Sequence, residues 1–320
     1  MNKSYPIPQR ILLDLAQAEK ELIKAASSDN PVLAEACLST LKAGGKRLRP
    51  ALVLMAGMVG NYNVPALMPA AVASELIHMA SLIHDDVLDD AGTRRGVPTV
   101  NAVWGETVAI AAGDYLFATA FDMLSRVDMR AVEIMVKAAL DLSLGELDQI
   151  ITAHVAEQTM DMYIQKAKRK TAALFCACCE VGSYLAGAPE VEVAALTNYG
   201  ENLGIAFQIY DDVLDIVGGS TGKAVGVDVR DGTVTVPVLY ALDALGRDSE
   251  LARVVAMKEP TDEQVRSAID MIVGCGAIVR TKATARAYVD TALESLNALS
   301  NKEAVAVFTG IGEFVVARYH

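Results

Sequence analysis

The pentapeptide Asp-Asp-Val-Leu-Asp occurs twice in the sequence, at residues 85–89 and again at residues 211–215. Each copy follows an apolar segment with helical periodicity. Residues four apart share one face of a helix, so each copy places its first and last carboxylates side by side. Like charges at this spacing destabilise an isolated helix by about 0.2–0.5 kcal/mol. The repeat therefore predicts two helices that hold something cationic at their acidic ends.

Composition favours helices over sheets. Hydrophobic residues make up 52% of the 320-residue chain and aromatic residues only 5%, so Ala, Leu, Val and Met supply most of the apolar mass. The one weak strand candidate is the Gly- and Val-rich segment 225–236. We expect a single domain over residues 1–320, because no linker or shift in composition interrupts the chain. Periodicity predicts helices at about 7–28, 31–43, 48–60, 66–91, 105–126, 129–156, 160–186, 190–217, 234–245, 262–273, 278–298 and 302–318.

Charge and cysteine content argue against several classes of protein. The net charge of −12 would repel a phosphate backbone, so we expect no nucleic-acid partner. Five cysteines make no disulfide framework and predict reduced thiols in a cytoplasmic protein. The N-terminus has no apolar signal core, and the longest uncharged segment, 51–74, contains prolines and asparagines that would break a spanning helix. The sequence therefore predicts no transmembrane segment.

Paired carboxylates fit three kinds of site. Mg²⁺ is usually bound by one or two carboxylates together with substrate phosphates. A glycosidase normally uses two single carboxylates rather than two clusters. A di-iron bundle needs two Glu-x-x-His motifs, and this sequence has one, from Glu75 to His78. A fourth interpretation, two solvated acidic turns, is disfavoured by the identity of the two copies.

Basic residues gather in three places against the acidic background, at residues 46–49, at Arg94 and Arg95, and at residues 166–170. Arginine binds phosphate oxygens through two N–H groups, and lysine supplies a point charge. Carboxylates, a metal ion and arginines on one cavity would form a diphosphate site. Each cluster also has a simpler interpretation, because residues 166–170 could be a solvated helix face and Lys46-Arg47 could cap a loop.

Together these motifs carry a resemblance to a known family. From about residue 10 to the C-terminus, the sequence resembles the trans-polyprenyl diphosphate synthases. Within them it is most similar to the catalytic component II of bacterial heptaprenyl diphosphate synthases. Terpene cyclases of the same fold carry only one such aspartate motif, which argues against a cyclase. The motifs that carry the resemblance are Gly44-Gly45-Lys46-Arg47-Leu48-Arg49-Pro50, Leu82-Ile83-His84-Asp85-Asp86-Val87-Leu88-Asp89-Asp90, Arg94-Arg95-Gly96, Gly113-Asp114-Tyr115-Leu116, Lys170-Thr171, Gln208-Ile209-Tyr210-Asp211-Asp212-Val213-Leu214-Asp215 and Gly222-Lys223.

The resemblance implies an all-α antiparallel bundle around a deep central cavity, the isoprenoid synthase type of fold. It implies condensation of isopentenyl diphosphate with an allylic diphosphate, farnesyl or geranylgeranyl diphosphate, whose leaving group would be held by about three Mg²⁺ ions. The implied metal ligands are Asp85, Asp89, Asp211 and Asp215, with Asp86, Asp212, Arg94 and Lys170 also catalytic. The implied allylic diphosphate site comprises Arg94, Lys170, Thr171, Gln208 and Lys223. The implied isopentenyl diphosphate site comprises Lys46, Arg49, His78 and Arg95.

Product length depends on the helix that leads into the first motif. Ala80 and Ser81, one turn before Asp85, are small, whereas short-chain relatives usually have an aromatic residue there as the cavity floor. An extended isoprene unit spans roughly one helical turn, so each turn without a plug admits about one more unit. We expect a product of about C30–C40, with C20–C25 as the alternative. Further residues expected to set the length are Ile77 and Phe117, with Ser74 and Phe121 as additional candidates.

One departure from the family pattern concerns the loop after the second motif. Many relatives have a lysine where this chain has Thr233, so one cation is missing over the diphosphate. A partner subunit could compensate, and we expect either a homodimer or a heterodimer with a small non-catalytic subunit. We also expect transient membrane contact during product release. The competing hypotheses are a non-catalytic subunit of a heteromeric synthase and a terpene cyclase or head-to-head condensing enzyme.

Overall fold

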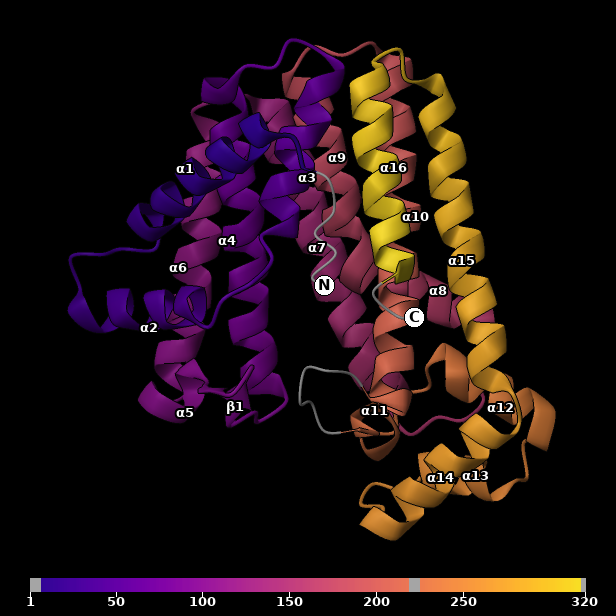
Figure 1. Cartoon of the computed structure of the whole chain (residues 1–320). Coiled ribbons are helices and arrows are strands. Elements are labelled where there is room, and N and C mark those ends of the chain that lie inside the picture. The colour runs from indigo at the N-terminus through magenta and orange to yellow at the C-terminus, as the bar shows by residue number, and fades with distance from the viewer. Residues whose placement is uncertain (1–6, 219–224, 318–320) are drawn as a thin grey trace.

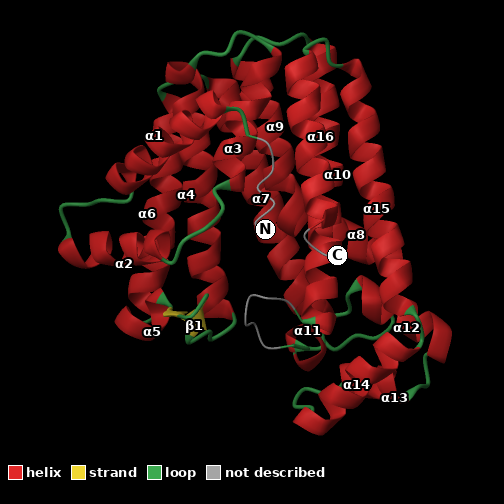
Figure 2. Ribbon diagram, viewed as in Figure 1, coloured by secondary structure: helices red, strands yellow, loops and turns green. Residues whose placement is uncertain are grey.

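The computed structural model describes residues 7–218 and 225–317. This part of the chain is almost entirely helical, and its only strands form one short antiparallel hairpin (Figure 2). The predicted all-α fold is therefore confirmed. In chain order the elements are α1 (Gln9–Ala25), α2 (Pro31–Lys42), α3 (Leu48–Ala56), η1 (Gly57–Val59), α4 (Val64–Leu88), β1 (Thr93–Arg94), β2 (Val97–Pro98), α5 (Val100–Trp104), α6 (Glu106–Ser125), α7 (Met129–Thr152), α8 (Met160–Ala167), η2 (Lys168–Ala172), α9 (Ala173–Leu185), α10 (Glu190–Val217), α11 (Val227–Arg230), α12 (Val236–Leu245), α13 (Glu250–Val255), α14 (Asp262–Gly274), α15 (Ala277–Ser295), η3 (Leu296–Ala298) and α16 (Lys302–Ala317).

The long helices form two packed groups that share one core. Helix α4 packs mainly on α6 and α3, whereas α10 packs mainly on α9 and α15 (Figure 1). Helix α9 contacts both α3 and α10 and so joins the groups. The buried apolar side chains form one cluster, which runs from Ile11 to Val316. The acidic ends of α4 and α10 lie at the same end of the bundle in Figure 1.

Three sequence predictions need correction. The strand candidate at 225–236 is wrong, because the segment contains the short helix α11. Gly226 adopts the left-handed conformation there, with φ of +80°, which glycine tolerates without steric cost. The predicted helix 160–186 is interrupted by a π-helical turn, η2, which carries Lys170 and Thr171. The short helices α5 and α13 were not predicted.

Two described helices, α4 and α6, are long and apolar enough to cross a membrane by length and composition alone. The most apolar window of α4 is 78% buried inside the bundle, as expected for a core helix. In α6 only 33% of the corresponding window is buried. All five cysteines are free thiols, as predicted.

Candidate active site

The first aspartate motif lies at the C-terminal end of α4. Asp85 is in the last turn, and Asp89 is the first residue beyond the helix. The backbone N–H of Asp89 donates to the Asp85 carbonyl at 2.9 Å, so the two residues are stacked one turn apart as the spacing predicted. Burial raises the pKa of Asp85 to about 7, and the pKa of Asp89 is raised for the same reason. Both carboxylates are therefore short of compensating positive charge.

The second aspartate of the first motif, Asp86, is bound by an arginine from the β-hairpin. Asp86 is only 5% exposed, and Arg94 Nε donates to its Oδ1 at 2.7 Å. Burial raises the pKa of Asp86, and the charge of Arg94 opposes that rise. The hairpin β1–β2 thus delivers a guanidinium to the motif, and about a third of this side chain is exposed.

The second motif lies near the C-terminal end of α10. Its second aspartate, Asp212, accepts hydrogen bonds from neutral donors. Asp212 is 2% exposed. Its Oδ2 accepts the Tyr163 hydroxyl at 2.6 Å, and its Oδ1 accepts Gln208 Nε2 at 2.9 Å. The Thr171 hydroxyl in turn donates to Gln208 Oε1 at 2.5 Å. Burial raises the pKa of Asp212 to about 7, and these hydrogen bonds oppose the rise.

The last residue of the second motif is tied to the backbone of α11. The two carboxylate oxygens of Asp215 accept the N–H groups of Val227 and Asp228, each at 3.1 Å. The N–H of Gly226 donates to the Asp215 carbonyl at 2.7 Å. A carboxylate oxygen has more than one lone pair, so these bonds leave capacity for a further ligand. The contacts fold the segment after α10 back onto the motif.

Glu146 is a site residue that the sequence prediction missed. It is 7% exposed on α7, and its Oε2 lies 2.6 Å from Lys170 Nζ. Helix α7 approaches η2 so closely that a Cβ on Gly145 would lie 2.4 Å from the Lys170 nitrogen. Glu146 adds to the rise in the pKa of Asp85, and Lys170 opposes it. Its sequence signal was weak, because the same helix segment also carries the acidic residues Asp141 and Asp148.

Electrostatic effects connect each acidic end with charged groups outside its own motif. Asp89 of the first motif raises the pKa of Asp231, which follows α11 beyond the second motif. Asp211 raises the pKa of Arg49 and so opposes the lowering caused by burial. Lys170, next in sequence to Thr171, lowers the pKa of Asp89. Lys170 therefore lies beside the first motif, and Asp89 is near enough to influence Asp231, which follows the second motif.

The residues predicted to bind isopentenyl diphosphate are divided by the structure. A pocket between α2, α4 and the β-hairpin is lined by His78 and Arg95, together with Arg94, Asp86 and Gly44. Lys46 and Arg49 do not line this pocket. Lys46 Nζ lies 5.2 Å from the ring centre of Phe314, and the Arg49 guanidinium lies 5.3 Å from that of Phe175.

His78 is uncharged at neutral pH. Its pKa is well below the usual value, first because of burial and then because of the charges of Arg49, Arg95, Arg94 and Arg47. A neutral imidazole can donate one hydrogen bond and accept another. The position of His78, two turns before Asp85 on the same helix, agrees with the predicted proximity to the motif.

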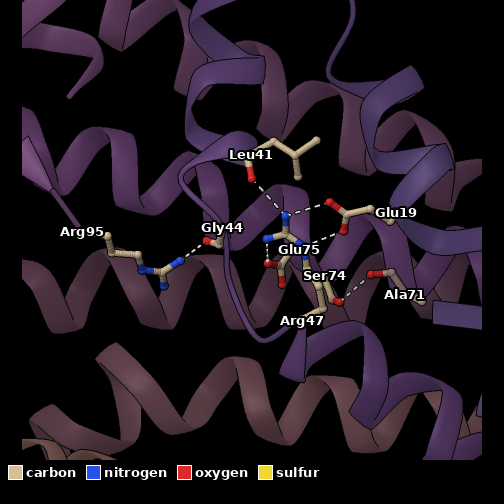
Figure 3. A network of polar contacts seen from close by, with 8 residues as sticks. All are labelled: Glu19, Leu41, Gly44, Arg47, Ala71, Ser74, Glu75 and Arg95. Atoms are coloured by element: carbon tan, nitrogen blue, oxygen red, sulfur yellow. Dashed lines mark hydrogen bonds and ion pairs between the residues drawn. The ribbon is translucent and has the colours of Figure 1, made fainter. Parts of the chain in front are cut away.

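Arg47 organises the glycine-rich turn before α3 and also lines the pocket that contains His78 and Arg95. Its guanidinium donates to Glu19 at 2.7 and 3.0 Å, to Glu75 at 3.0 Å and to the Leu41 carbonyl at 3.1 Å (Figure 3). It is the N-cap residue of α3 and adopts a left-handed conformation, with φ of +49°. Arg95 donates to the Gly44 carbonyl beside this network. The simpler interpretation of Lys46-Arg47, a cap for the loop, therefore holds for Arg47.

The proposed chain-length residues lie along the packed contact between α4 and α6. Ile77 and Ala80 are fully buried and Ser81 is 6% exposed. On α6, Phe117 and Phe121 stack with ring centres 6.4 Å apart. Small side chains thus occupy the turn of α4 before the first motif, with aromatic rings on the neighbouring helix. Lys223 lies outside the described residues.

The residues present fit a hard divalent cation. Oxygen donors dominate at both helix ends, and hard cations such as Mg²⁺ prefer oxygen ligands. Three aspartates at these ends, Asp85, Asp89 and Asp212, have pKa values raised by burial, and a cation would stabilise their charged forms. Among the described residues, no three metal-binding side chains already converge on one point. A cation bound to both helix ends would therefore need substrate oxygens as further ligands.

Two aspartate motifs at one end of a helical bundle, with a pocket rich in arginine beside the first, are typical of helical proteins that bind diphosphates. The sequence profile of the family described as polyprenyl synthetase matches residues 30–272. Heptaprenyl diphosphate synthase component 2 of Bacillus subtilis is 38% identical over 308 residues, covering 95% of this chain and 88% of that protein. The chain therefore belongs to the polyprenyl synthetase family, and the resemblance predicted from its motifs is confirmed.

Solved structures agree with this assignment. A decaprenyl diphosphate synthase from Rhodobacter capsulatus is 37% identical, with a TM-score of 0.92 and coverage of 98% of both chains. A polyprenyl synthase from Caulobacter crescentus, crystallised with calcium and isoprenyl diphosphate, is 32% identical with a TM-score of 0.90. It covers 99% of this chain and 100% of its own. The fold is therefore that of the polyprenyl synthases.

Proposed function

We propose that this chain is a Mg²⁺-dependent trans-prenyltransferase, which condenses isopentenyl diphosphate with farnesyl or geranylgeranyl diphosphate into an all-trans product of about C30–C40. The observation that carries the proposal is that the helices bearing the two aspartate motifs end at the same end of the bundle, with Lys170 beside the first motif. Membership of the polyprenyl synthetase family supports the reaction class. The whole chain would act as one domain in the cytoplasm.

The side chains of the site can bind and orient both diphosphates. Asp85, Asp89, Asp211 and Asp215 would hold about three Mg²⁺ ions, which supply positive charge at the oxygens of the leaving diphosphate. Arg94 and Lys170 already lie at the motifs, paired to Asp86 and Glu146, and would transfer hydrogen bonds to those oxygens. His78 and Arg95 would orient isopentenyl diphosphate in the pocket that they line.

The reaction then needs exclusion of water more than a protein base. As diphosphate leaves the allylic carbon, the double bond of isopentenyl diphosphate attacks that carbon, and the released diphosphate can accept the proton. Water at this point would convert the allylic cation into an alcohol. The apolar faces of α4 and α6, with Ala80 and Ile77 fully buried, would enclose the hydrocarbon chain and keep water out.

The partner that we propose is either a second copy or a small non-catalytic subunit. The Bacillus subtilis relative is named as component 2 of its enzyme, which supports a heteromeric assembly. Helix α7 carries a stripe of leucine and isoleucine side chains at helical spacing that are 47–64% exposed, namely Leu140, Leu144, Leu147 and Ile151. Such a stripe is typical of a helix that packs against another chain. Light scattering of the purified chain, alone and with a candidate small subunit, distinguishes the two assemblies.

Incubation with labelled isopentenyl diphosphate, farnesyl diphosphate and Mg²⁺ tests the proposed reaction. Elongated diphosphates are expected, with chain lengths resolved by chromatography after removal of the diphosphate. A hydrocarbon product would indicate a cyclase or a head-to-head enzyme. An absence of turnover, both alone and with the candidate subunit, would indicate a non-catalytic subunit.

A further inference from the structure

Tyr163 connects α8 to the second aspartate motif through a buried hydrogen bond. The side chain is 2% exposed, like that of Asp212. The distance from its hydroxyl to Asp212 Oδ2 is 2.6 Å, within the range of a hydrogen bond to a carboxylate. The bond joins residues 49 positions apart. No part of the proposed reaction uses this tyrosine directly.

The bond completes a chain of donors that fixes one carboxylate on both sides. Gln208 Nε2 donates to the other oxygen of Asp212, and Thr171 donates to Gln208. The buried side chain of Lys166 also lies near enough to lower the pKa of Asp212. Both oxygens of Asp212 are therefore occupied by neutral protein donors in a fully buried setting.

This arrangement decides how the neighbouring carboxylate is presented. Asp211 and Asp212 are consecutive on α10, so fixing the side chain of Asp212 also fixes the rotation of that helical turn. Tyr163 lies on α8, which runs directly into η2 with Lys170 and Thr171. The phenol thus couples the turn that carries Asp211 to the turn that carries Lys170.

We infer that Tyr163 is a positioning residue that holds the second aspartate motif in register with Lys170, so that the motif binds a magnesium-diphosphate group. The inference rests on the proposed function for its substrate. Because Asp212 is 2% exposed, the inference assigns it to the protein's own hydrogen-bond network. Asp211 and the remaining lone pairs of the less buried Asp215 are left to face the ligand. Removal of the hydroxyl should weaken metal-diphosphate binding without touching the pocket lined by His78 and Arg95.

The test compares Tyr163→Phe with Tyr199→Phe. Tyr199 is a matched control, because it is fully buried on α10 and its hydroxyl donates to the Phe308 carbonyl at 2.6 Å, away from the motif. In Tyr163→Phe, the Mg²⁺ concentration for half-maximal activity and the KM for farnesyl diphosphate should each rise about tenfold, the usual size for a lost hydrogen bond to a charged group. The KM for isopentenyl diphosphate should stay within about twofold of wild type.

A binding measurement separates this inference from the proposed function. The rise in Tm caused by MgCl₂ with inorganic diphosphate should be smaller in Tyr163→Phe than in wild type and unchanged in Tyr199→Phe. If wild type shows this rise but no elongation, the proposed function fails while the positioning role is still tested. Equal Mg²⁺ requirements and equal Tm rises in the two variants would overturn the role of Tyr163.

A second variant covers the case in which Tyr163→Phe does not fold. Gln208→Leu removes the donor to the other oxygen of Asp212 and is measured in the same way. The same selective increase in the Mg²⁺ requirement supports the inference. A response like that of Tyr199→Phe contradicts it.

Discussion

The two aspartate motifs have the same sequence but are held in different ways. In the first motif, Asp86 is paired with Arg94, a partly exposed cation on a two-residue strand. In the second, Asp212 accepts neutral hydrogen bonds from the buried Tyr163 and from Gln208. Asp89 lies just past the end of its helix, whereas Asp215 is bound by two backbone N–H groups of α11.

The difference indicates that the two motifs respond differently to substrate binding. An incoming diphosphate can compete with Asp86 for the guanidinium of Arg94, because both are anions that arginine binds through the same N–H groups. To compete with Asp212 for the donor hydroxyl of Tyr163, the substrate would have to reach a side chain that is only 2% exposed. The second motif is therefore preorganised, and the first is the one whose contacts rearrange when substrate binds.

The comparison is tested most severely by removing one carboxylate from each motif. Asp85→Asn and Asp211→Asn should each lower kcat by about 10²–10³-fold, because each removes a charge that in the proposed mechanism would hold the metal beside the developing negative charge. Steady-state assays over a range of Mg²⁺ concentrations measure the effect. Asp122→Asn, an exposed residue whose carboxylate pairs with Arg126, is the matched control and should retain full activity. If the Asn variants kept wild-type turnover, metal binding by the motifs would be wrong.

Replacement of the arginine of the first motif should have the next largest effect. Arg94→Met should raise the KM for the allylic diphosphate by about 10–100-fold, since a charge-assisted bond to phosphate is lost. The effect should shrink at high salt, because much of it is electrostatic. Arg126→Met, which removes an exposed i,i+4 partner of Asp122, serves as control. Equal KM values for Arg94→Met and wild type would show that Arg94 pairs with Asp86 and does not bind the allylic diphosphate.

Product length should respond to a change on the helix of the first motif. Ser81, four residues before Asp85, corresponds in the second copy to Phe207, which packs on Phe175 at 5.4 Å between ring centres. Ala80→Phe should place a ring on α4 one position before Ser81 and shorten the product to about C15–C20, with turnover reduced by less than about tenfold. Chromatography of the dephosphorylated products measures this shift. An unchanged product would refute the assignment of the cavity floor to this turn.

Local patterns were enough to predict the fold class and the stacking of each carboxylate pair. The four-residue spacing of Asp85 and Asp89 fixes their relation on any helix, whatever the rest of the chain does. Local patterns could not predict the partners of Asp212 and Lys170, because those partners depend on contacts between helices. Tyr163 and Glu146 are single buried polar residues with no periodic signal, and their roles appear only when α8, α7 and α10 are packed together.

In the segment after α10, local sequence predicted the wrong structure, again because a contact with another part of the chain decides it. Its valines suggested a strand, but Asp215 accepts the N–H groups of Val227 and Asp228 and so stabilises the start of a helical turn. This contact spans about one dozen residues and overrides a β-propensity that depends strongly on context. Sequence periodicity therefore predicted helices that bury one face, and it failed where a single side chain decides the local structure.

The smallest expected effect concerns stability without metal. Burial raises the pKa of Asp85 to about 7, above the value of about 3.9 in an unfolded chain. Between these values the folded chain binds more protons than the unfolded chain, so the contribution of Asp85 makes the protein less stable as pH rises through this window. In EDTA at pH 8, Asp85→Asn should therefore raise Tm by about 1–3 °C, and the gain should disappear near pH 4.

Asp212→Asn provides the contrasting case, although burial also raises the pKa of Asp212 to about 7. An asparagine there would place an N–H₂ group against Tyr163 or Gln208, both of which donate in the native structure, so one buried donor would lose its acceptor. Asp212→Asn should therefore lower Tm at pH 8 while Asp85→Asn raises it. Thermal unfolding of both variants with and without Mg²⁺ measures this sign difference. A gain in Tm for both variants would mean that charge burial outweighs hydrogen bonding at the second motif as well, and the two motifs would then be equivalent.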